Sequence, residues 1–127
     1  MMTQEARLQI KCVKTFYRLY PQAWGRLFMN YNNPRSARNG RILVSMGLTA
    51  GVADLTLLSD VGVIFIELKT GKNQQNENQK SWQKQIESAG FRYHLIRSEM
   101  EFFELVTQVM KGGITYPGGG QNFGQNG

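Results

Sequence analysis

The segment that most constrains the fold is the run VIFIELK at residues 63–69. Its β-branched and aromatic side chains predict a strand that is apolar on both faces until its end. A strand of that kind lies in the middle of a sheet whose two faces are both covered. At 127 residues the chain supports one domain with one hydrophobic core. The run therefore predicts an α/β domain built around a central strand.

The other expected elements place a small sheet between helices. Helices are predicted where apolar residues recur every three or four positions, and strands where short apolar runs lie between turn residues. The expected helices are residues 3–19, 37–46, 77–89 and 98–110, and the expected strands are residues 27–30, 52–58, 63–69 and 91–96. The predicted fold class is α/β, with a small mixed sheet and a central antiparallel hairpin flanked by helices. Residues 1–111 would form this domain, followed by a Gly-rich tail at residues 112–127.

Basic charge is concentrated in the first half of the chain. The net charge is +6, and no Asp or Glu occurs between Ala6 and Ala53. Basic side chains spaced three or four apart form two stripes, which consist of Arg7, Lys11, Lys14 and Arg18, and of Arg35, Arg38 and Arg41. A one-sided basic surface attracts nucleic acid. A solvated face on a slightly basic protein is the alternative.

The sequence also argues against several classes of protein. No apolar run approaches the roughly 20 residues that a membrane span needs, so no membrane partner is expected. The first residues include no apolar signal segment. The single cysteine, Cys12, excludes an internal disulfide and a cysteine-only zinc site. These features favour an intracellular location, in the cytoplasm of a bacterium or of a virus-infected host cell.

Three ionisable residues are brought together by the predicted hairpin. If Leu58 pairs with Val63, Asp54 falls directly opposite Glu67. Opposed residues on one face have Cβ atoms about 4.5–5.5 Å apart. Lys69 shares this face, because side chains alternate along a strand. The hairpin therefore projects two carboxylates and one ammonium group toward one point.

This arrangement suits a divalent cation. Two facing carboxylates repel each other unless a positive charge lies between them. Mg²⁺ (or Mn²⁺) meets that need, since it binds one or two carboxylates and accepts phosphate oxygens. With a cation polarising a phosphodiester, Lys69 would orient the attacking water or stabilise charge on the phosphate. A salt-bridge cluster of Asp, Glu and Lys at the end of a hairpin is the alternative that the spacing leaves open.

The helix predicted at residues 77–89 adds a polar side chain to this group. Trp82, Ile86 and Ala89 share a stripe that should pack inward, which draws Gln79 toward the same side. An inward glutamine needs a hydrogen-bonding partner, and the preceding loop can place it beside the carboxylates. A glutamine wetted by solvent at the edge of the helix is the alternative.

Several short motifs follow one another in a characteristic order. They are EARLQ (residues 5–9), GLTAGVADL (47–55), VIFIELKTGK (63–72), Q-x-x-W within NENQKSWQ (76–83) and AGF (89–91). Together they resemble the VRR-NUC domain, the virus-type replication-repair nuclease branch of the PD-(D/E)XK superfamily. One departure is Ala53, where many members have proline before the aspartate. Alanine keeps the backbone conformation accessible, so we do not interpret this departure as a loss of activity.

The resemblance implies a restriction-endonuclease-like core and a divalent-metal-dependent phosphodiesterase that acts on DNA. The metal ligands it implies are Asp54, Glu67, the backbone carbonyl of Leu68 and, through water or as a support, Glu5. Lys69 would be the catalytic lysine, and Gln79 would orient groups around the metal and the water. Catalytic roles are thus expected for Asp54, Glu67, Lys69 and Gln79.

Stand-alone members of this branch resemble dimeric, structure-selective nucleases. We therefore expect a homodimeric endonuclease for branched DNA, such as Holliday junctions or flaps, that works in DNA repair. The alternatives are a non-catalytic DNA-binding module and an exonuclease or restriction-type nuclease of the same superfamily. The basic stripes and Lys72 would hold DNA phosphates. Trp24 and Tyr31 can either stack on bases or serve as core or interface aromatics.

Overall fold

A computed structural model describes residues 1–31 and 37–113, without the side chains of residues 37–39. Its elements are α1 (Gln4–Leu19), the 3-10 helix η1 (Pro21–Ala23), β1 (Leu27–Met29), α2 (Ala37–Ser45), β2 (Leu55–Ser59), β3 (Gly62–Leu68), α3 (Glu77–Ser88), β4 (Arg92–Ile96) and α4 (Glu99–Val109). Within this part of the chain, none of the helices combines the length and the apolar character of a bilayer-spanning segment. Arg35 and residues 114–127, which are most of the expected tail, lie outside the described residues.

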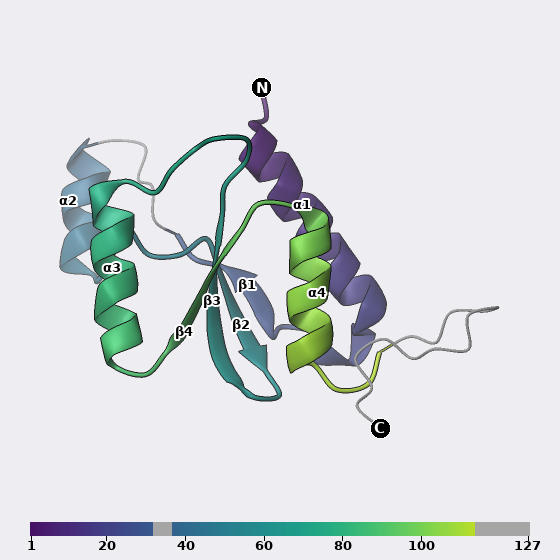
Figure 1. Ribbon diagram of the computed structural model, residues 1–127. Helices are drawn as coiled ribbons and strands as arrows, with labels where there is room; N and C mark the ends of the chain where they lie inside the picture. Colours follow the sequence, from purple (N-terminus) through teal and green to yellow (C-terminus); the bar gives the residue numbers. More distant parts are fainter. Residues whose placement is uncertain (32–36, 114–127) are drawn as a thin grey trace.

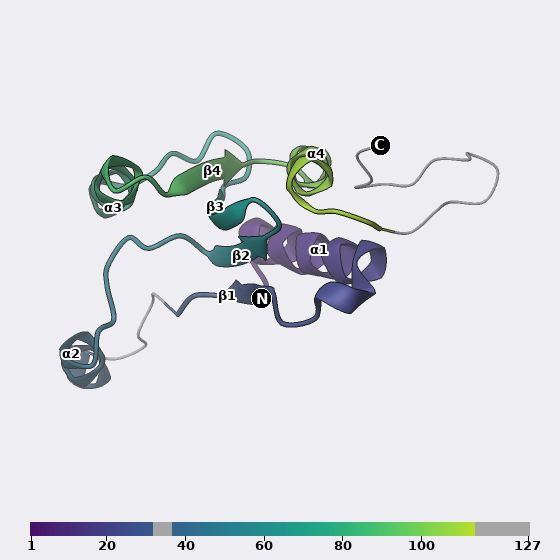
Figure 2. The ribbon, with the colours of Figure 1, turned by 90° about the horizontal axis from the view of Figure 1, so that it is seen from below.

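The four strands form one mixed sheet in the order β1-β2-β3-β4. The pairs β1/β2 and β2/β3 are antiparallel, and β4 returns parallel to β3 after α3. α1 and α4 lie on one side of this sheet, and α3 lies on the other (Figure 1 and Figure 2). The predicted fold class is therefore confirmed, with β3 as the interior strand that the apolar run indicated.

The two faces of β3 carry different side chains. Ile64, Ile66 and Leu68 enter the hydrophobic core beneath α1 and α4. Phe65 lies on the opposite face, where its ring packs edge-on against Trp82 of α3 at a centroid distance of 5.0 Å. This alternation places the next odd-numbered residue of β3, Glu67, under the first turn of α3.

The hairpin has the predicted register but a shorter first strand. Ser59 pairs with Gly62 and Leu58 with Val63, whereas β2 begins only at Leu55. The residues before Leu55 leave the β2/β3 ladder because their segment turns toward α3. Asp54 still binds the sheet edge, since its carbonyl accepts a 2.8 Å hydrogen bond from the Asn30 N–H.

The ends of the helices follow local capping rules, with one error in the predicted packing. The Thr3 side chain caps α1 by accepting from the Ala6 N–H, and this places Glu5 in the first turn of the helix. In α3, Trp82 and Ile86 are half-buried, but Ala89 is exposed and not inward-facing as predicted. The reason is that α3 ends at Ser88, so that Ala89 is its C-cap and no longer follows the helical stripe.

Candidate functional site

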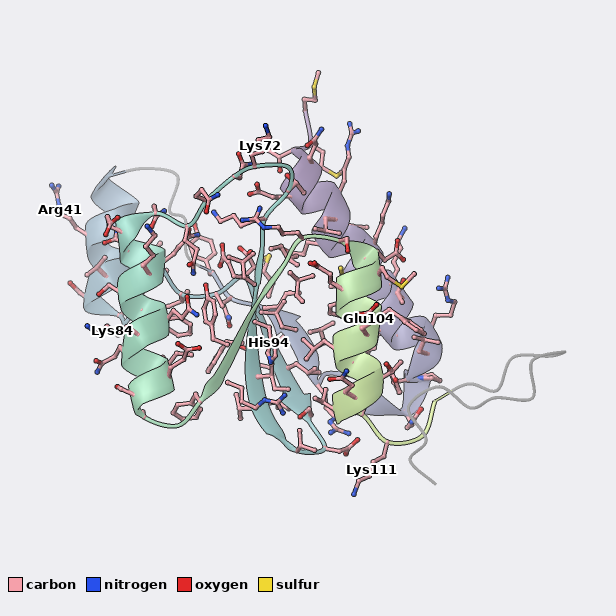
Figure 3. All side chains as sticks on the ribbon, in the orientation of Figure 1. Arg41, Lys72, Lys84, His94, Glu104 and Lys111 are labelled. Carbon is pink, nitrogen blue, oxygen red and sulfur yellow. The ribbon has the colours of Figure 1, made fainter. Side chains whose placement is uncertain are left out.

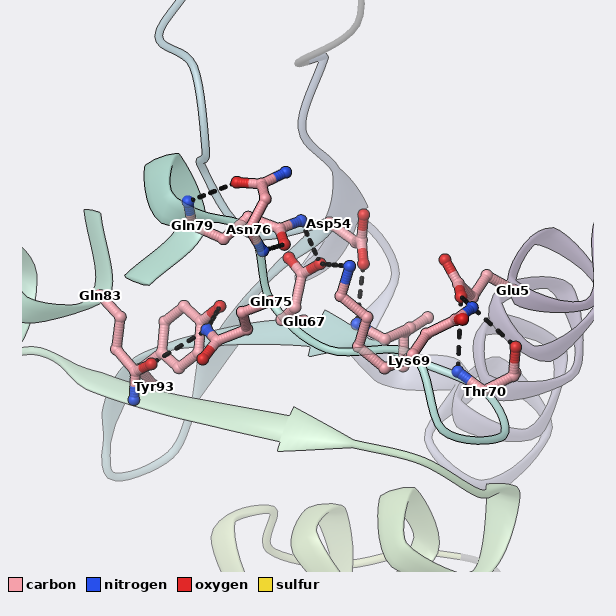
Figure 4. Close-up of polar contacts among 12 residues, drawn as sticks. Glu5, Asp54, Glu67, Lys69, Thr70, Gln75, Asn76, Gln79, Gln83 and Tyr93 are labelled. Carbon is pink, nitrogen blue, oxygen red and sulfur yellow. Dashed lines mark hydrogen bonds and ion pairs between the residues drawn. The ribbon is translucent and has the colours of Figure 1, made fainter. Parts of the chain in front are cut away.

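Side chains from the hairpin, α1 and α3 converge on one polar cleft of about 360 Å³ (Figure 4). The cleft is lined by Glu5, Ala50, Gly51, Asp54, Glu67, Lys69, Asn76, Asn78 and Gln79. Asp54 lies one position beyond the last pair of the β2/β3 ladder, and its Oδ2 accepts a 2.7 Å hydrogen bond from the Leu68 N–H. The two carboxylates therefore meet on the α3 side of the sheet.

Glu67 is the most unusual group in the cleft, because this ionisable residue is only 1% exposed. Its Oε2 accepts a 2.7 Å hydrogen bond from Gln79 Nε2 and lies 3.7 Å from Lys69 Nζ. Its Oε1 is buried and has no hydrogen-bond partner. Burial, followed by the negative charge of Asp54, raises the pKa of Glu67 to about 8, although Lys69 acts in the opposite direction.

The pKa of Asp54 is raised as well. Burial raises the pKa of Asp54, and the charge of Glu5 adds to this effect. The Leu68 N–H and the Lys69 ammonium group lower the pKa but do not cancel the effect of burial. Two adjacent carboxyl groups thus resist full ionisation, and the single ammonium group beside them does not supply enough positive charge.

These donors fit a hard divalent cation. Carboxylate oxygens are the ligands that Mg²⁺ and Mn²⁺ prefer, and the unpartnered Oε1 of Glu67 provides a free ligand atom. Among residues 1–31 and 37–113, no three His, Cys, Asp or Glu side chains lie close enough together to enclose an ion. The protein can therefore offer two carboxylates, Asp54 and Glu67, with the remaining positions left to backbone oxygen, water or a substrate phosphate.

Glu5 lies at the rim of the cleft and binds the loop that follows β3. Its Oε2 accepts hydrogen bonds from Asn73 Nδ2 at 2.6 Å, from the Thr70 N–H at 3.5 Å and from Thr70 Oγ1 at 3.4 Å. Partial burial raises the pKa of Glu5, but these donors and Lys69 outweigh burial and leave the pKa below its ordinary value. Glu5 is thus an ionised support that ties residues 70–73 to α1.

Gln79 is held in place by a capping box that our sequence reasoning missed. The Asn76 side chain accepts from the Gln79 N–H, and Gln79 Oε1 accepts from the Asn76 N–H, both at 2.9 Å. These bonds leave Gln79 Nε2 directed at Glu67 (Figure 4). The signal was present in the sequence, because Asn-x-x-Gln before a helical run is a capping pattern.

Gly51 brings the segment before Asp54 against the start of α3. Its φ of +86° favours glycine, and a Cβ at this position would lie 2.3 Å from the carbonyl oxygen of Asn78. The backbone of the loop therefore touches the first turn of α3 directly. This close approach forms one wall of the cleft.

The predicted DNA-binding side chains lie around the cleft and along α1. Arg7, Lys11, Lys14, Arg18, Arg41 and Lys72 are all exposed. Figure 3 shows Lys72 on the loop between β3 and α3, near the first turns of α1, and Arg41 on α2. Arg35 and the side chain of Arg38 fall outside the described parts of the structure.

The two aromatic residues singled out in the sequence are not part of the core. Trp24 is 81% exposed and Tyr31 is 55% exposed. The Trp24 ring rests on Tyr17 at a centroid distance of 4.9 Å. Tyr31 follows the end of β1, on the side of the molecule that carries the loop at residues 47–52. Their interpretation as core residues is wrong, and their stacking on bases or at an interface stays a prediction.

Comparisons with known proteins agree with this architecture. No family model and no curated protein matches the sequence. The chain is similar to a solved structure named "VRR_NUC domain protein", with a TM-score of 0.68 and 16% sequence identity. The similarity covers 86% of this chain and 89% of that chain. At this identity the comparison establishes the fold, so the chain has a VRR-NUC fold.

Proposed function

We propose that this protein is a divalent-metal-dependent DNA endonuclease whose centre is formed by Asp54, Glu67 and Lys69. The observation that carries the proposal is the buried Glu67 carboxylate, which faces Asp54 with one oxygen unpartnered. Ionising a buried carboxyl group that lacks a full set of donors is costly, and a bound cation would compensate for that cost. The VRR-NUC fold adds independent support for a nuclease.

Each residue of the cleft has a task in phosphodiester hydrolysis. A divalent cation held by Asp54, Glu67 and the Leu68 carbonyl would polarise the phosphate and lower the pKa of a bound water. Lys69 lies 3.7 Å from Glu67 and is positioned to stabilise negative charge that develops on the attacked phosphate. Gln79 holds the Glu67 carboxylate in place through its 2.7 Å hydrogen bond. Glu5 positions the loop that carries Lys72.

The basic side chains would bind the DNA backbone. The described ion pairs join Arg26 to Asp60, Lys69 to Glu67 and Lys80 to Glu77, so none of them uses the stripe on α1. That stripe begins beside the cleft and extends about 16 Å from it, as measured by the helical rise between its first and last residues. It can therefore contact several phosphates and supply position rather than sequence specificity.

We further propose that two copies of the chain form a homodimer and act on branched DNA. α2 lies apart from the other helices (Figure 2), and three apolar residues on it or directly after it are exposed. Ile42 and Met46 lie about one helical turn apart and are 56% and 77% exposed, respectively, while Val44, on another side of the helix, is 61% exposed. A second copy would cover the face of Ile42 and Met46 and present two cutting sites related by a twofold axis. We also propose an intracellular location, where branched DNA occurs.

The first experiment is cleavage of plasmid DNA, linear duplex, flaps and four-way junctions with Mg²⁺ or Mn²⁺. We expect cleavage of branched DNA by the wild type, a loss of at least about 100-fold in Asp54→Asn and Glu67→Gln, and none without metal. Glu104→Gln is the control, because Glu104 is an exposed carboxylate on α4 (Figure 3). Product sizing separates internal cuts from the degradation of ends.

The outcomes distinguish the alternatives. DNA binding without cleavage under any metal condition would support a non-catalytic module and refute the enzyme. Equal cleavage of linear duplex and junctions would refute selectivity for branched DNA.

The dimer has its own measurement, which is the molar mass by light scattering. Ile42→Asp should halve that mass, and a wild-type monomer at micromolar concentration would contradict the dimer.

A further inference from the structure

A second cleft, of about 300 Å³, adjoins the polar one on the same side of the sheet. It lies between the end of β1, the loop after α2 and the inner side of α3. The side chains that define its character are Tyr31, Leu48, Thr49, Val52, Phe65 and Trp82. We call it the aromatic cleft. The nuclease chemistry proposed above uses none of these residues.

Along both β3 and α3, the aromatic cleft lies next to the carboxylates of Asp54 and Glu67. Phe65 precedes Glu67 by two residues on the same face of β3, which corresponds to about 6.6 Å along the strand. Trp82 follows Gln79 by three residues, or about 4.5 Å along α3. At its outer wall, Tyr31 directly follows Asn30, whose N–H donates to the Asp54 carbonyl. A nucleotide with its phosphate at the carboxylates would therefore reach the cleft with its base.

The walls of the aromatic cleft suit a flat ligand. Trp82 is fixed by contacts with Phe65 at 5.0 Å and with Tyr93 at 6.2 Å, so it provides a rigid platform. Tyr31 is 55% exposed, which leaves its ring able to approach a ligand from the outer side. The volume is at the lower limit for ligand pockets and matches a single small ring system better than a peptide segment.

We propose that the aromatic cleft binds one unstacked nucleobase of the DNA strand that is cut, with Tyr31 and Trp82 as its stacking surfaces. This inference rests on the proposed nuclease function and adds a physical reason for its substrate class. Bases in a regular duplex remain stacked, and extruding one of them costs energy. At a junction or flap the bases unstack more easily, so a base-binding cleft beside the carboxylates favours branched DNA.

The test is an abasic scan of a cleavable junction, with Mn²⁺ as the metal. Each nucleotide around the cut site is replaced in turn by an abasic residue, and cleavage is measured under single-turnover conditions. An abasic residue at one position should reduce wild-type cleavage by about 5- to 150-fold, the range expected for the loss of one base–aromatic stack. Tyr31→Ala should cleave intact DNA more slowly than the wild type by a similar factor. An abasic residue at the sensitive position should then slow this variant no further.

Two control variants separate stacking from other effects. Tyr31→Phe keeps the ring and should retain both the activity and the position-specific loss. Trp24→Ala removes a ring that is 81% exposed but lies beyond the C-terminal end of α1, and it should leave the abasic profile unchanged. A merely destabilised protein would instead lose activity equally at every position.

The possible failures are distinguishable. A wild type that cuts with a uniform abasic profile would overturn the base cleft and leave the nuclease intact. A wild type that does not cut would refute the nuclease, and the cleft is then tested by binding alone. For that purpose 2-aminopurine is placed at the branch in metal-free complexes. Fluorescence quenching that Tyr31→Ala abolishes would support base stacking, and quenching equal in both proteins would overturn it.

Discussion

Replacing Glu67 with glutamine should stabilise the metal-free protein at high pH. The substitution preserves the shape of a side chain that is 1% exposed but removes its charge. The new amide can still accept the hydrogen bond from Gln79, and it can donate to Asp54. In the wild type, burial and then the charge of Asp54 raise the pKa of Glu67 to about 8, compared with an ordinary value of 4.5. The carboxylate therefore weakens the folded state whenever it is ionised.

The sign and the size of the effect follow from proton linkage. Between pH 4.5 and about 8, the folded state keeps a proton on Glu67 that the unfolded state has released. The free energy of unfolding therefore falls as the pH rises through this window. The difference between the two pKa values corresponds to at most about 5 kcal/mol, and local opening to water reduces it, so we expect about 2–4 kcal/mol.

Urea denaturation in EDTA at pH 5.5 and pH 9 measures this difference. The wild type should lose about 2–3 kcal/mol more than Glu67→Gln between the two pH values, because only the wild type releases this proton and part of the linkage window lies below pH 5.5. Glu104→Gln, at an exposed position on α4, should follow the wild type. Equal losses in the wild type and in Glu67→Gln would refute the reasoning. Adding Mg²⁺ at pH 8 should stabilise the wild type and Glu104→Gln but not Glu67→Gln, because only the first two proteins keep both carboxylates that bind the ion.

The remaining predictions concern Gly51 in the wall of the polar cleft, the Lys69 amine and the basic stripe on α1. Gly51→Ala should destabilise the protein by about 2–4 kcal/mol in thermal unfolding and reduce cleavage. The control is Gly47→Ala, since Gly47 also has a positive φ but has open space where its Cβ would lie; this variant should lose only about 1–2 kcal/mol. Lys69→Ala should abolish turnover and keep metal-free junction binding in a gel shift; lost binding would contradict its assignment. Arg7→Ala should reduce by about 1 the magnitude of the slope obtained when the logarithm of the DNA association constant is plotted against the logarithm of the salt concentration. Lys111→Ala, at the far end of α4, should leave that slope unchanged.

The carboxylate pair was predictable because its determinants are local. Two residues connect β2 to β3, and the pairing of Ser59 with Gly62 fixes every later pair in the ladder. Counting back from this pair places Asp54 opposite Glu67. The apolar pattern of β3 similarly predicted an interior strand. Short-range rules of this kind are readable from one sequence, whereas the exact start of β2 depended on a contact with α3.

The surroundings of the pair were less predictable because distant segments form them. Gln79 was expected to face inward, but its aim depends on Asn76 and on the path of the loop before it. That path is tied down by Glu5, which lies 68 positions before its partner Asn73. The aromatic cleft likewise combines residues from β1, a loop, β3 and α3. No periodicity within one element reveals such a convergence.

The geometry of Glu67 also bears on the salt-bridge cluster that the spacing left open. A cluster that served stability alone would satisfy both oxygens of a buried carboxylate, since leaving one unpartnered costs about 1–3 kcal/mol. Here Lys69 contacts Oε2, at 3.7 Å, while Oε1 is buried without a hydrogen-bond partner. Replacing a buried ionic pair by well-packed apolar residues is often neutral or stabilising, so stability alone does not call for this arrangement. An arrangement that is unfavourable in the free protein, yet complementary to a cation, is therefore better explained by binding than by stability.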